Sequence, residues 1–222
     1  MTRNKHFPKR RHRPVVLLAC LAVAGFGLSS VLAQEADPHA HHRMMMQEKS
    51  APSQDSIVLP DTTLVTQNGE QLRLRSDVVG GRIVVIDFVY TTCTTVCPVL
   101  SAILSQVQGR LDGRIGGDVM LVSISVDPVR DTPARLKAYA DRLRADDGWV
   151  WLTGDKQAVD GVLEQLGAYS PNFEDHPSMV LVGDPASGDW ARYLGFPSSD
   201  QIVAKVDQLS AARNTQSATW EQ

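Results

Sequence analysis

The chain has 222 residues, of which 43% are hydrophobic and 21% are charged, as is ordinary for a globular protein. Six of the 22 basic residues and none of the 25 acidic residues fall within residues 1–33, so the remainder has a net charge of −9. This acidic balance argues against a nucleic-acid partner. Without its ends, the chain is long enough for one domain of about 150–170 residues.

The first 33 residues have the pattern of a targeting segment. A basic region ends at Arg13, and an apolar stretch runs from Val15 to Ala33, closing with Val31-Leu32-Ala33 as at a signal-peptidase site. The stretch is also long enough to cross a bilayer if it is not removed. Residues 1–33 are therefore predicted to be a signal peptide or an N-terminal membrane anchor, with Cys20 as a bystander. In either case the domain is expected to be exported, periplasmic or held at the outer face of the inner membrane.

Residues 34–56 are polar and without periodicity, which predicts a flexible linker. Eight residues of this linker contain three histidines and three methionines: His39, His41, His42, Met44, Met45 and Met46. Imidazole and thioether groups suit copper in either oxidation state, so this His/Met tract is a candidate accessory copper site. A tether of biased composition explains the same residues equally well, and both interpretations stay open.

The domain is expected to span residues 57–213, followed by a frayed polar tail at 214–222. Two short strands, 62–66 and 71–74, flank Asn68-Gly69, which is a strong hairpin signal. The remaining pattern predicts, in chain order, strand 83–90, helix 98–111, strand 119–126, a helix capped by Thr132 with Pro133 in its first turn, strand 149–152, a helix capped by Asp155 and ended by Gly167, a hairpin of 179–182 and 190–193, and a last helix from Ser199 or Asp200. This order predicts a thioredoxin-like α/β fold, with a central mixed sheet, helices on both faces and an N-terminal hairpin.

Cys93 and Cys97 lie where an apolar strand is expected to turn into a helix, directly before Pro98. Pro98 suits the first helical position, which would place Cys97 at or beside the N-cap. A helix N-terminus stabilises an anion, so the thiol of Cys97 is expected to have a lowered pKa and to attack or to bind a metal. A structural disulfide, or two buried thiols, is the alternative explanation.

His176 is the only histidine after residue 50, and it lies in a polar segment just before the expected strand 179–182. A lone histidine is usually a surface residue or a satisfied core residue. Together with the two cysteines, however, it would give three soft-to-borderline donors, a set that suits Cu(I). Structural zinc would require four ligands, and only three are in view.

Three acidic residues are further candidates. Asp127 and Asp131 lie between a strand and a helix, where turn formation and helix capping would explain them. The alternative is that they dock a partner or support the loop that carries Cys93 and Cys97. Asp87 interrupts the apolar strand 83–90. It is either a buried acid below the dithiol, able to move protons, or a side chain facing a sheet edge and solvent.

Three motifs, taken together in this order, resemble the Sco (SenC) family of copper-binding, thioredoxin-like proteins: Tyr90–Pro98, Ser125–Pro133 and Asp175-His176. The resemblance covers about residues 55–210. It implies Cys93, Cys97 and His176 as ligands of Cu(I) and Cu(II), and Cys93–Cys97 as a redox-active disulfide. Thr94 and Pro177 depart from the usual family pattern without replacing a ligand.

The resemblance further implies a copper metallochaperone, rather than an enzyme, that delivers copper to the binuclear copper site of cytochrome c oxidase. Its partner would be the copper-bearing subunit of the oxidase or another exported copper protein. The alternative is a thiol–disulfide oxidoreductase that reduces the copper-site cysteines of a client. Three residues separate the cysteines here, against two in thioredoxin-type enzymes, and this spacing favours chelation. A peroxiredoxin-type peroxidase is disfavoured because Tyr90 stands where that family needs proline.

Overall fold

Eight strands form one mixed sheet in the described part of the chain. The computed structural model describes residues 53–54 and 57–219, all of which belong to the unit Pro38–Gln222. The strand order across the sheet is β1-β8-β7-β4-β5-β6-β2-β3. In chain order the strands are β1 (Ser53–Gln54), β2 (Thr63–Thr66), β3 (Gln71–Arg73), β4 (Ile83–Val89), β5 (Val119–Ser125), β6 (Trp149–Thr153), β7 (Met179–Asp184) and β8 (Asp189–Leu194).

The middle of the sheet places the candidate residues at one edge. β4, β5 and β6 run parallel to one another, whereas β7 lies antiparallel to β4, with Val180 opposite Asp87. Every residue of β4 and β5 is buried, as the near-continuous apolar run of β4 predicts. The three parallel strands therefore end, and β7 begins, at the same edge of the sheet, which we call the site edge.

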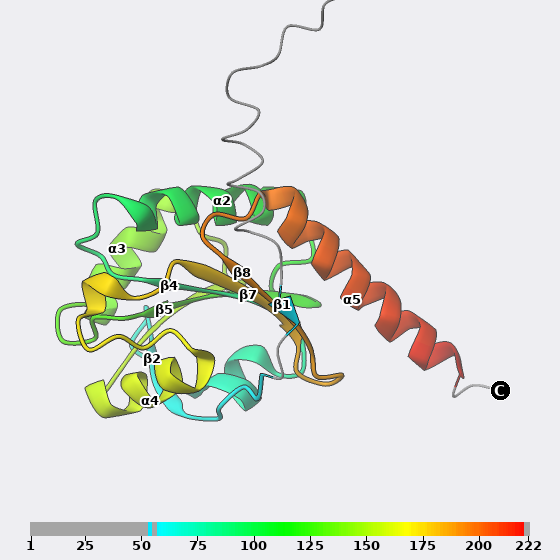
Figure 1. The fold of residues 1–222 in the computed structure, drawn as a ribbon, viewed down its shortest axis with the longest axis horizontal. Helices are drawn as coiled ribbons and strands as arrows, with labels where there is room; N and C mark the ends of the chain where they lie inside the picture. The colour runs from blue at the N-terminus through cyan, green and yellow to red at the C-terminus, as the bar shows by residue number, and fades with distance from the viewer. Residues whose placement is uncertain (1–52, 55–56, 220–222) are drawn as a thin grey trace, which may run out of the picture. The chain divides into compact units, whose positions relative to one another are not determined.

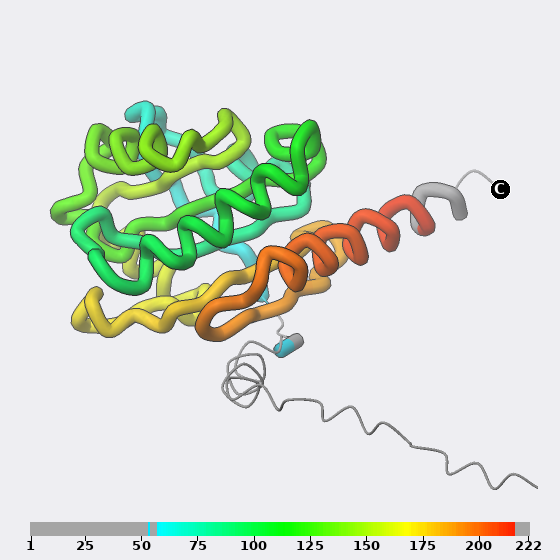
Figure 2. The backbone as a smooth tube through the Cα atoms, turned by 90° about the horizontal axis from the view of Figure 1, so that it is seen from above, coloured from blue at the N-terminus to red at the C-terminus, as the bar shows by residue number. Residues whose placement is uncertain are grey.

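Helices cover both faces of the sheet (Figure 1). Seen from above, α2, α3 and α5 lie across one face (Figure 2). Ile83 and Val85 of β4 pack under these helices, while Val84 and Ile86 pack on the opposite face, against η1 and α4. The predicted thioredoxin-like α/β architecture, with a mixed sheet between helices and an N-terminal hairpin, is confirmed. The helices are the π-helix η1 (Leu74–Val79), α2 (Val96–Arg110), α3 (Pro133–Leu143), α4 (Lys156–Leu166), the short 3-10 helix η2 (Phe173–Asp175) and α5 (Ser199–Thr219).

The helix caps agree with the predictions from sequence. The side chain of Thr132 accepts a hydrogen bond from the N–H of Arg135 at the start of α3. Asp155 does the same for α4, accepting from the N–H of Gln157 at 2.9 Å. Gly167 ends α4 with a φ of 71°, in the left-handed region that glycine adopts without strain.

Two helix boundaries differ from the prediction. α2 begins at Val96, with Thr95 as N-cap, so Cys97 is its second residue rather than its cap. Pro98 is still tolerated there, because the first four N–H groups of a helix have no partner within it. α5 continues to Thr219, through part of the segment that was predicted to be a frayed tail. η1 was not predicted.

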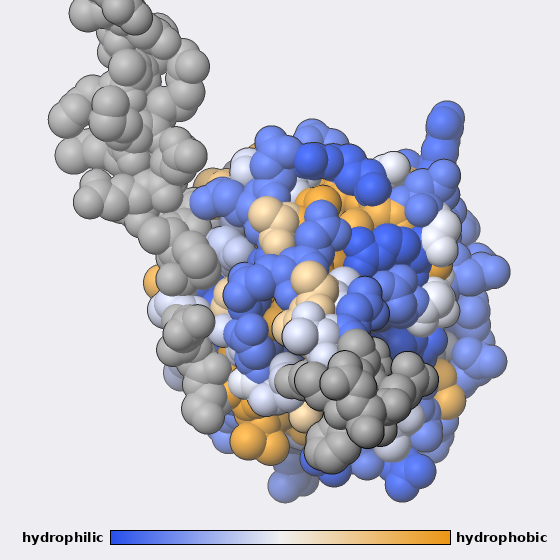
Figure 3. Space-filling view, turned by 90° about the vertical axis from the view of Figure 1, so that its right-hand side faces the viewer, coloured by the Kyte–Doolittle hydropathy of each residue, from blue (hydrophilic) through white to orange (hydrophobic). Residues whose placement is uncertain are grey.

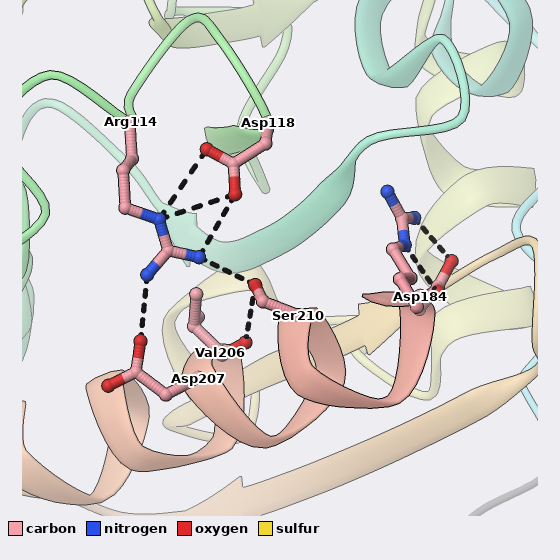
Figure 4. Close-up of polar contacts among 7 residues, drawn as sticks. Arg114, Asp118, Asp184, Val206, Asp207 and Ser210 are labelled. Carbon is pink, nitrogen blue, oxygen red and sulfur yellow. Dashed lines mark hydrogen bonds and ion pairs between the residues drawn. The ribbon is translucent and has the colours of Figure 1, made fainter. Parts of the chain in front are cut away.

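The later turns of α5 are tied to the edge of the sheet opposite the site edge (Figure 4). Arg114 donates hydrogen bonds to Asp207 at 2.7 Å and to Ser210 at 2.6 Å. One turn further on, the guanidinium of Arg213 pairs with the buried carboxylate of Asp184, at 2.7 Å from Nε to Oδ2. These bonds hold the later turns of α5 against the rest of the domain as far as Arg213.

The surface on the side to which α5 projects is mostly hydrophilic, with scattered apolar patches (Figure 3). A hydrophilic surface with scattered apolar residues is typical of a solvent-exposed face. Among the described residues, none of the helices combines the length and the apolar character that a bilayer span requires. The predicted signal peptide or anchor (1–33) and nearly all of the predicted linker (34–56) lie outside the described residues.

Candidate metal and redox site

Both cysteines lie at the site edge, just beyond the end of β4. A tight turn follows the strand, closed by a hydrogen bond of 3.1 Å from the N–H of Cys93 to the carbonyl of Tyr90. Cys97 is on the first turn of α2, and its N–H donates to the sulfur of Cys93 at 3.3 Å. Both are free thiols, Cys97 fully buried and Cys93 8% exposed. The α2 N-terminus is therefore directed at Cys93, the first cysteine of the pair.

This geometry gives the two thiols different acidities. Burial by itself would raise the pKa of Cys93, but hydrogen bonds from the thiol and N–H of Cys97, and from the N–H of Thr95, outweigh it. With a further bond from the Tyr90 hydroxyl, they lower the pKa of Cys93 from 9.0 to about 7. Burial raises the pKa of Cys97, and its hydrogen bond to Cys93 raises it further. The expectation that Cys97 carries the lowered pKa was therefore wrong, because the N–H groups of α2 stabilise the neighbouring sulfur instead.

His176 presents an unpaired ring nitrogen inside the protein. It follows η2, and its Nδ1 lies 2.7 Å from the carbonyl oxygen of Phe173. A carbonyl only accepts hydrogen bonds, so Nδ1 carries a proton, and in the neutral imidazole this tautomer leaves the lone pair on Nε2. Nε2 is buried and has no hydrogen-bond partner in the described structure. A buried polar atom without a partner is costly, and a lone pair of this kind is free to bind a metal.

Tyr90 connects the histidine to the cysteines. Its ring meets the ring of His176 edge-to-face, with centroids 5.8 Å apart, and its hydroxyl hydrogen-bonds to Cys93. The pairing of β7 with β4 explains this approach, since the residues before β7 lie beyond the end of β4. No three His, Cys, Asp or Glu side chains of the described residues are grouped closely enough to hold a metal ion. A single ion bound by Cys93, Cys97 and His176 thus requires their side chains to move together.

Asp131 hydrogen-bonds to two different chain segments rather than to the helix that follows it. Its carboxylate accepts from the N–H of Thr91 at 3.1 Å, from the Thr91 hydroxyl at 2.5 Å and from the Ser125 hydroxyl at 2.7 Å. The side chain is almost fully buried, at 1% exposed. The preferred explanation of Asp131, turn and cap chemistry, is therefore incomplete, because Thr132 alone caps α3 and Asp131 joins the cysteine turn to the end of β5.

Asp127 is buried at 4% exposed and pairs with Arg130 at 2.9 Å. Its carbonyl accepts from the N–H groups of Arg130 and Asp131, as in a turn. The turn interpretation of Asp127 agrees with this geometry. The guanidinium of Arg130 also lies over the ring of Phe173, 5.3 Å from its centroid.

Asp87 is fully buried, so the interpretation that it faces solvent is wrong. One carboxylate oxygen accepts from the Ser123 hydroxyl at 2.5 Å, and that hydroxyl accepts from the indole N–H of Trp149 at 2.9 Å. The other oxygen has no hydrogen-bond partner among the described residues. Burial raises the pKa of Asp87 from 3.8 to about 7, only partly opposed by the bond from Ser123. At neutral pH this acid can therefore hold or release a proton.

Reasoning from sequence missed the residues that connect the site. Reasoning from sequence treats Ser125 only as the first residue of a motif, and Tyr90 only as a motif residue that argues against a peroxidase; it does not single out Phe173. No spacing rule could have predicted that Tyr90 contacts His176, because 86 positions separate the two residues in the chain. The His/Met tract, from His39 to Met46, lies outside the described residues.

Comparisons with known proteins agree with this picture. The SCO1/SenC family model matches residues 50–210. A SCO1 protein homolog from Bacillus subtilis (strain 168) is 35% identical over 164 residues, covering 68% of this chain and 82% of that protein. Two solved structures each align with 72% of this chain and 98% of their own. BsSco, described as a Sco-family cytochrome c oxidase assembly protein with a disulfide switch, is 27% identical at a TM-score of 0.60. Copper-bound ScoI from Bradyrhizobium japonicum is 26% identical at a TM-score of 0.55. By the extent of these matches, the chain belongs to the SCO1/SenC family.

Proposed function

We propose that this protein is an exported copper metallochaperone that binds copper and delivers it to the binuclear copper site of cytochrome c oxidase. The observation that carries the proposal is the buried, unpaired Nε2 of His176, at the same edge of the sheet as a dithiol whose Cys93 has a pKa of about 7. Membership of the SCO1/SenC family supports it. So do the copper-bound relative and the relative described as an oxidase assembly protein.

The donor set suits copper as a cargo. The thiolates of Cys93 and Cys97 and the Nε2 of His176 would bind Cu(I), which prefers such soft and borderline donors to oxygen. The Nδ1–H of His176 donates a hydrogen bond to the Phe173 carbonyl, and this bond favours the imidazole tautomer whose Nε2 can bind a metal. Burial raises the pKa of Cys97, so copper binding must release a proton from that thiol, and affinity should rise with pH.

The test is an anaerobic Cu(I) titration of the reduced protein against a competing chelator. We expect one Cu(I) per domain, and no tight binding by Cys93→Ser or by Cys97→Ser. His176→Ala should weaken binding by more than the ~10–100-fold that loss of an outer-shell partner costs. The protein oxidised to the Cys93–Cys97 disulfide is the matched control, because it has the same sequence but no thiolates, and it should not bind. Parent-like binding by both serine variants would overturn the proposal.

A second function is favoured by the difference between the two thiols. A disulfide reductase needs an acidic thiol that attacks and a second, more deeply buried thiol that resolves. The pKa of Cys93 is lowered while that of Cys97 is raised, and Cys93, at 8% exposed, is the less deeply buried of the two. The Cys93 thiolate would attack a client disulfide, forming a mixed disulfide and releasing one client thiolate. Cys97 would lose its proton and attack the Cys93 sulfur, releasing the second client thiolate. The client gains two electrons, and Cys93–Cys97 becomes a disulfide.

His176 separates the two functions experimentally. In His176→Ala both cysteines remain, so a reductase should keep its rate with a disulfide-bonded peptide that contains two copper-site cysteines. A metallochaperone should lose copper affinity in the same variant. If His176→Ala leaves copper affinity at the parent value, and the serine variants lose only disulfide reduction, the oxidoreductase function replaces the metallochaperone function.

A further inference from the structure

The loop between β5 and α3 contacts both halves of the candidate site. We call its residues Asp127–Asp131 the brace loop. It lies at the site edge, after the buried strand β5, and its backbone is closed by hydrogen bonds from the N–H groups of Arg130 and Asp131 to the carbonyl of Asp127. Two of its side chains reach outward to other segments, one toward the cysteines and one toward His176.

The first contact is made by the carboxylate of Asp131. It binds both the N–H and the hydroxyl of Thr91, which lies inside the turn that delivers Cys93 from β4. The same carboxylate binds the hydroxyl of Ser125 at the end of β5. Because Asp131 is only 1% exposed, water competes little for these bonds. The position of the cysteine turn is therefore tied to the neighbouring strand through one side chain.

The second contact is made by Arg130. Its guanidinium is held by the buried carboxylate of Asp127 at 2.9 Å and lies over the ring of Phe173. Phe173 in turn accepts the Nδ1 hydrogen bond of His176 through its carbonyl oxygen. The brace loop and His176 also line one small cavity of about 60 Å³ together with Phe173. The side chain of Arg130 is 55% exposed, so this contact is weaker than that of Asp131.

We propose that the brace loop sets the spacing between the dithiol and His176, with Asp131 as the positioning residue for the cysteines and Arg130 as the positioning residue for the histidine. For copper this rests on the proposed function, but the effect of Asp131 on the thiols does not. Neither side chain is a ligand. Each acts through a residue that precedes a ligand in the chain, Thr91 in one case and Phe173 in the other.

The experiment compares Asp131→Asn and Arg130→Gln with two matched controls from the opposite edge of the sheet. Asp184→Asn changes an equally buried, hydrogen-bonded carboxylate at the end of β7, and Arg114→Gln changes an arginine with several partners that precedes β5 (Figure 4). The end of β7 and the start of β5 both lie opposite the site edge. A milder variant of the cysteine contact, Thr91→Val, removes only the hydroxyl bond to Asp131 and covers the case in which Asp131→Asn does not fold.

Two measurements separate the two contacts. The first is the equilibrium constant of the Cys93–Cys97 dithiol and disulfide in a glutathione buffer, without copper. Asp131→Asn should shift this constant about tenfold, because the turn that sets the distance between the sulfurs loosens. The second is the nitrogen hyperfine splitting in the electron paramagnetic resonance spectrum of the Cu(II)-loaded protein. Arg130→Gln should reduce the nitrogen hyperfine splitting from His176, while its dithiol–disulfide equilibrium constant stays closer to the parent value than that of Asp131→Asn.

The outcomes decide between a positioning role and a merely structural one. Shifts in the two site variants, with parent-like values in Asp184→Asn and Arg114→Gln, support the proposal. Equal shifts in the controls, or parent-like values for both measurements in Asp131→Asn, Thr91→Val and Arg130→Gln, overturn it. If the parent itself binds no copper, the proposed function fails, while the copper-free thiol equilibrium still tests Asp131.

Discussion

Replacing Asp87 by asparagine should make the reduced, copper-free protein more stable at pH 8. The Asp87 carboxyl is fully buried, and one of its two oxygens has no partner among the described residues. Asparagine keeps an oxygen for the Ser123 hydroxyl and places an uncharged amide where the unpartnered oxygen lies. The substitution therefore removes the cost of burying a charge while keeping the hydrogen bond from Ser123.

The magnitude follows from the pKa of Asp87, which burial raises from 3.8 to about 7. At about 1.36 kcal/mol per pKa unit, this difference corresponds to roughly 4 kcal/mol of lost stability once the group is ionised in both states. Between pH 3.8 and 7 the folded state binds more protons than the unfolded state, so stability falls as pH rises. From pH 5 to pH 8 the parent should lose roughly 2–3 kcal/mol through this group, and Asp87→Asn should not.

Urea unfolding at pH 5 and pH 8 measures this difference as the change in the free energy of unfolding. Asp184→Asn is the control of opposite sign. Burial would raise the pKa of Asp184, but the bonds from Arg213 lower it, so its contribution is present at neutral pH and is lost as pH falls. That variant should be less stable than the parent at pH 8. If Asp87→Asn is also less stable than the parent at pH 8, Asp87 is ionised and paired in the fold, and the reasoning is wrong.

Three further predictions concern the thiols and the N-terminal segment. The rate at which iodoacetamide alkylates the reduced protein should rise with pH with a midpoint near pH 7, and this midpoint should disappear in Cys93→Ser. The reason is that hydrogen bonds at the α2 N-terminus lower the pKa of Cys93 despite its burial. A midpoint near the ordinary value of 9.0 would contradict this. Residues 1–50 fused to a reporter that is active only outside the cytoplasm should yield activity, whereas a signal from a cytoplasmic reporter would refute export. Deleting residues 39–46 should leave one copper per domain but slow its uptake at low copper supply, and unchanged uptake would favour the tether interpretation.

Sequence alone determined the fold class and the sheet edge at which the chemistry lies. The run Ile83–Val89 is apolar and β-branched at nearly every position, and such a segment is stable only between two covered faces. The cap residues Thr132 and Asp155 fixed where α3 and α4 begin, because side-chain capping is a local interaction within one turn. The position of the cysteines after the central strand then placed them at the site edge. These features depend on neighbours in the chain, which a sequence displays directly.

The tertiary structure alone decided which thiol is acidic, whether Asp87 is buried and what Asp131 contacts. α2 starts two residues earlier than its proline suggested, and this shift directs the N–H of Cys97 at Cys93. The contact between Tyr90 and His176 and the bond from Thr91 to Asp131 join residues that are 86 and 40 positions apart. Such contacts depend on the register of β4 against β5 and β7. That register comes from packing both faces of the sheet at once, which no local pattern records.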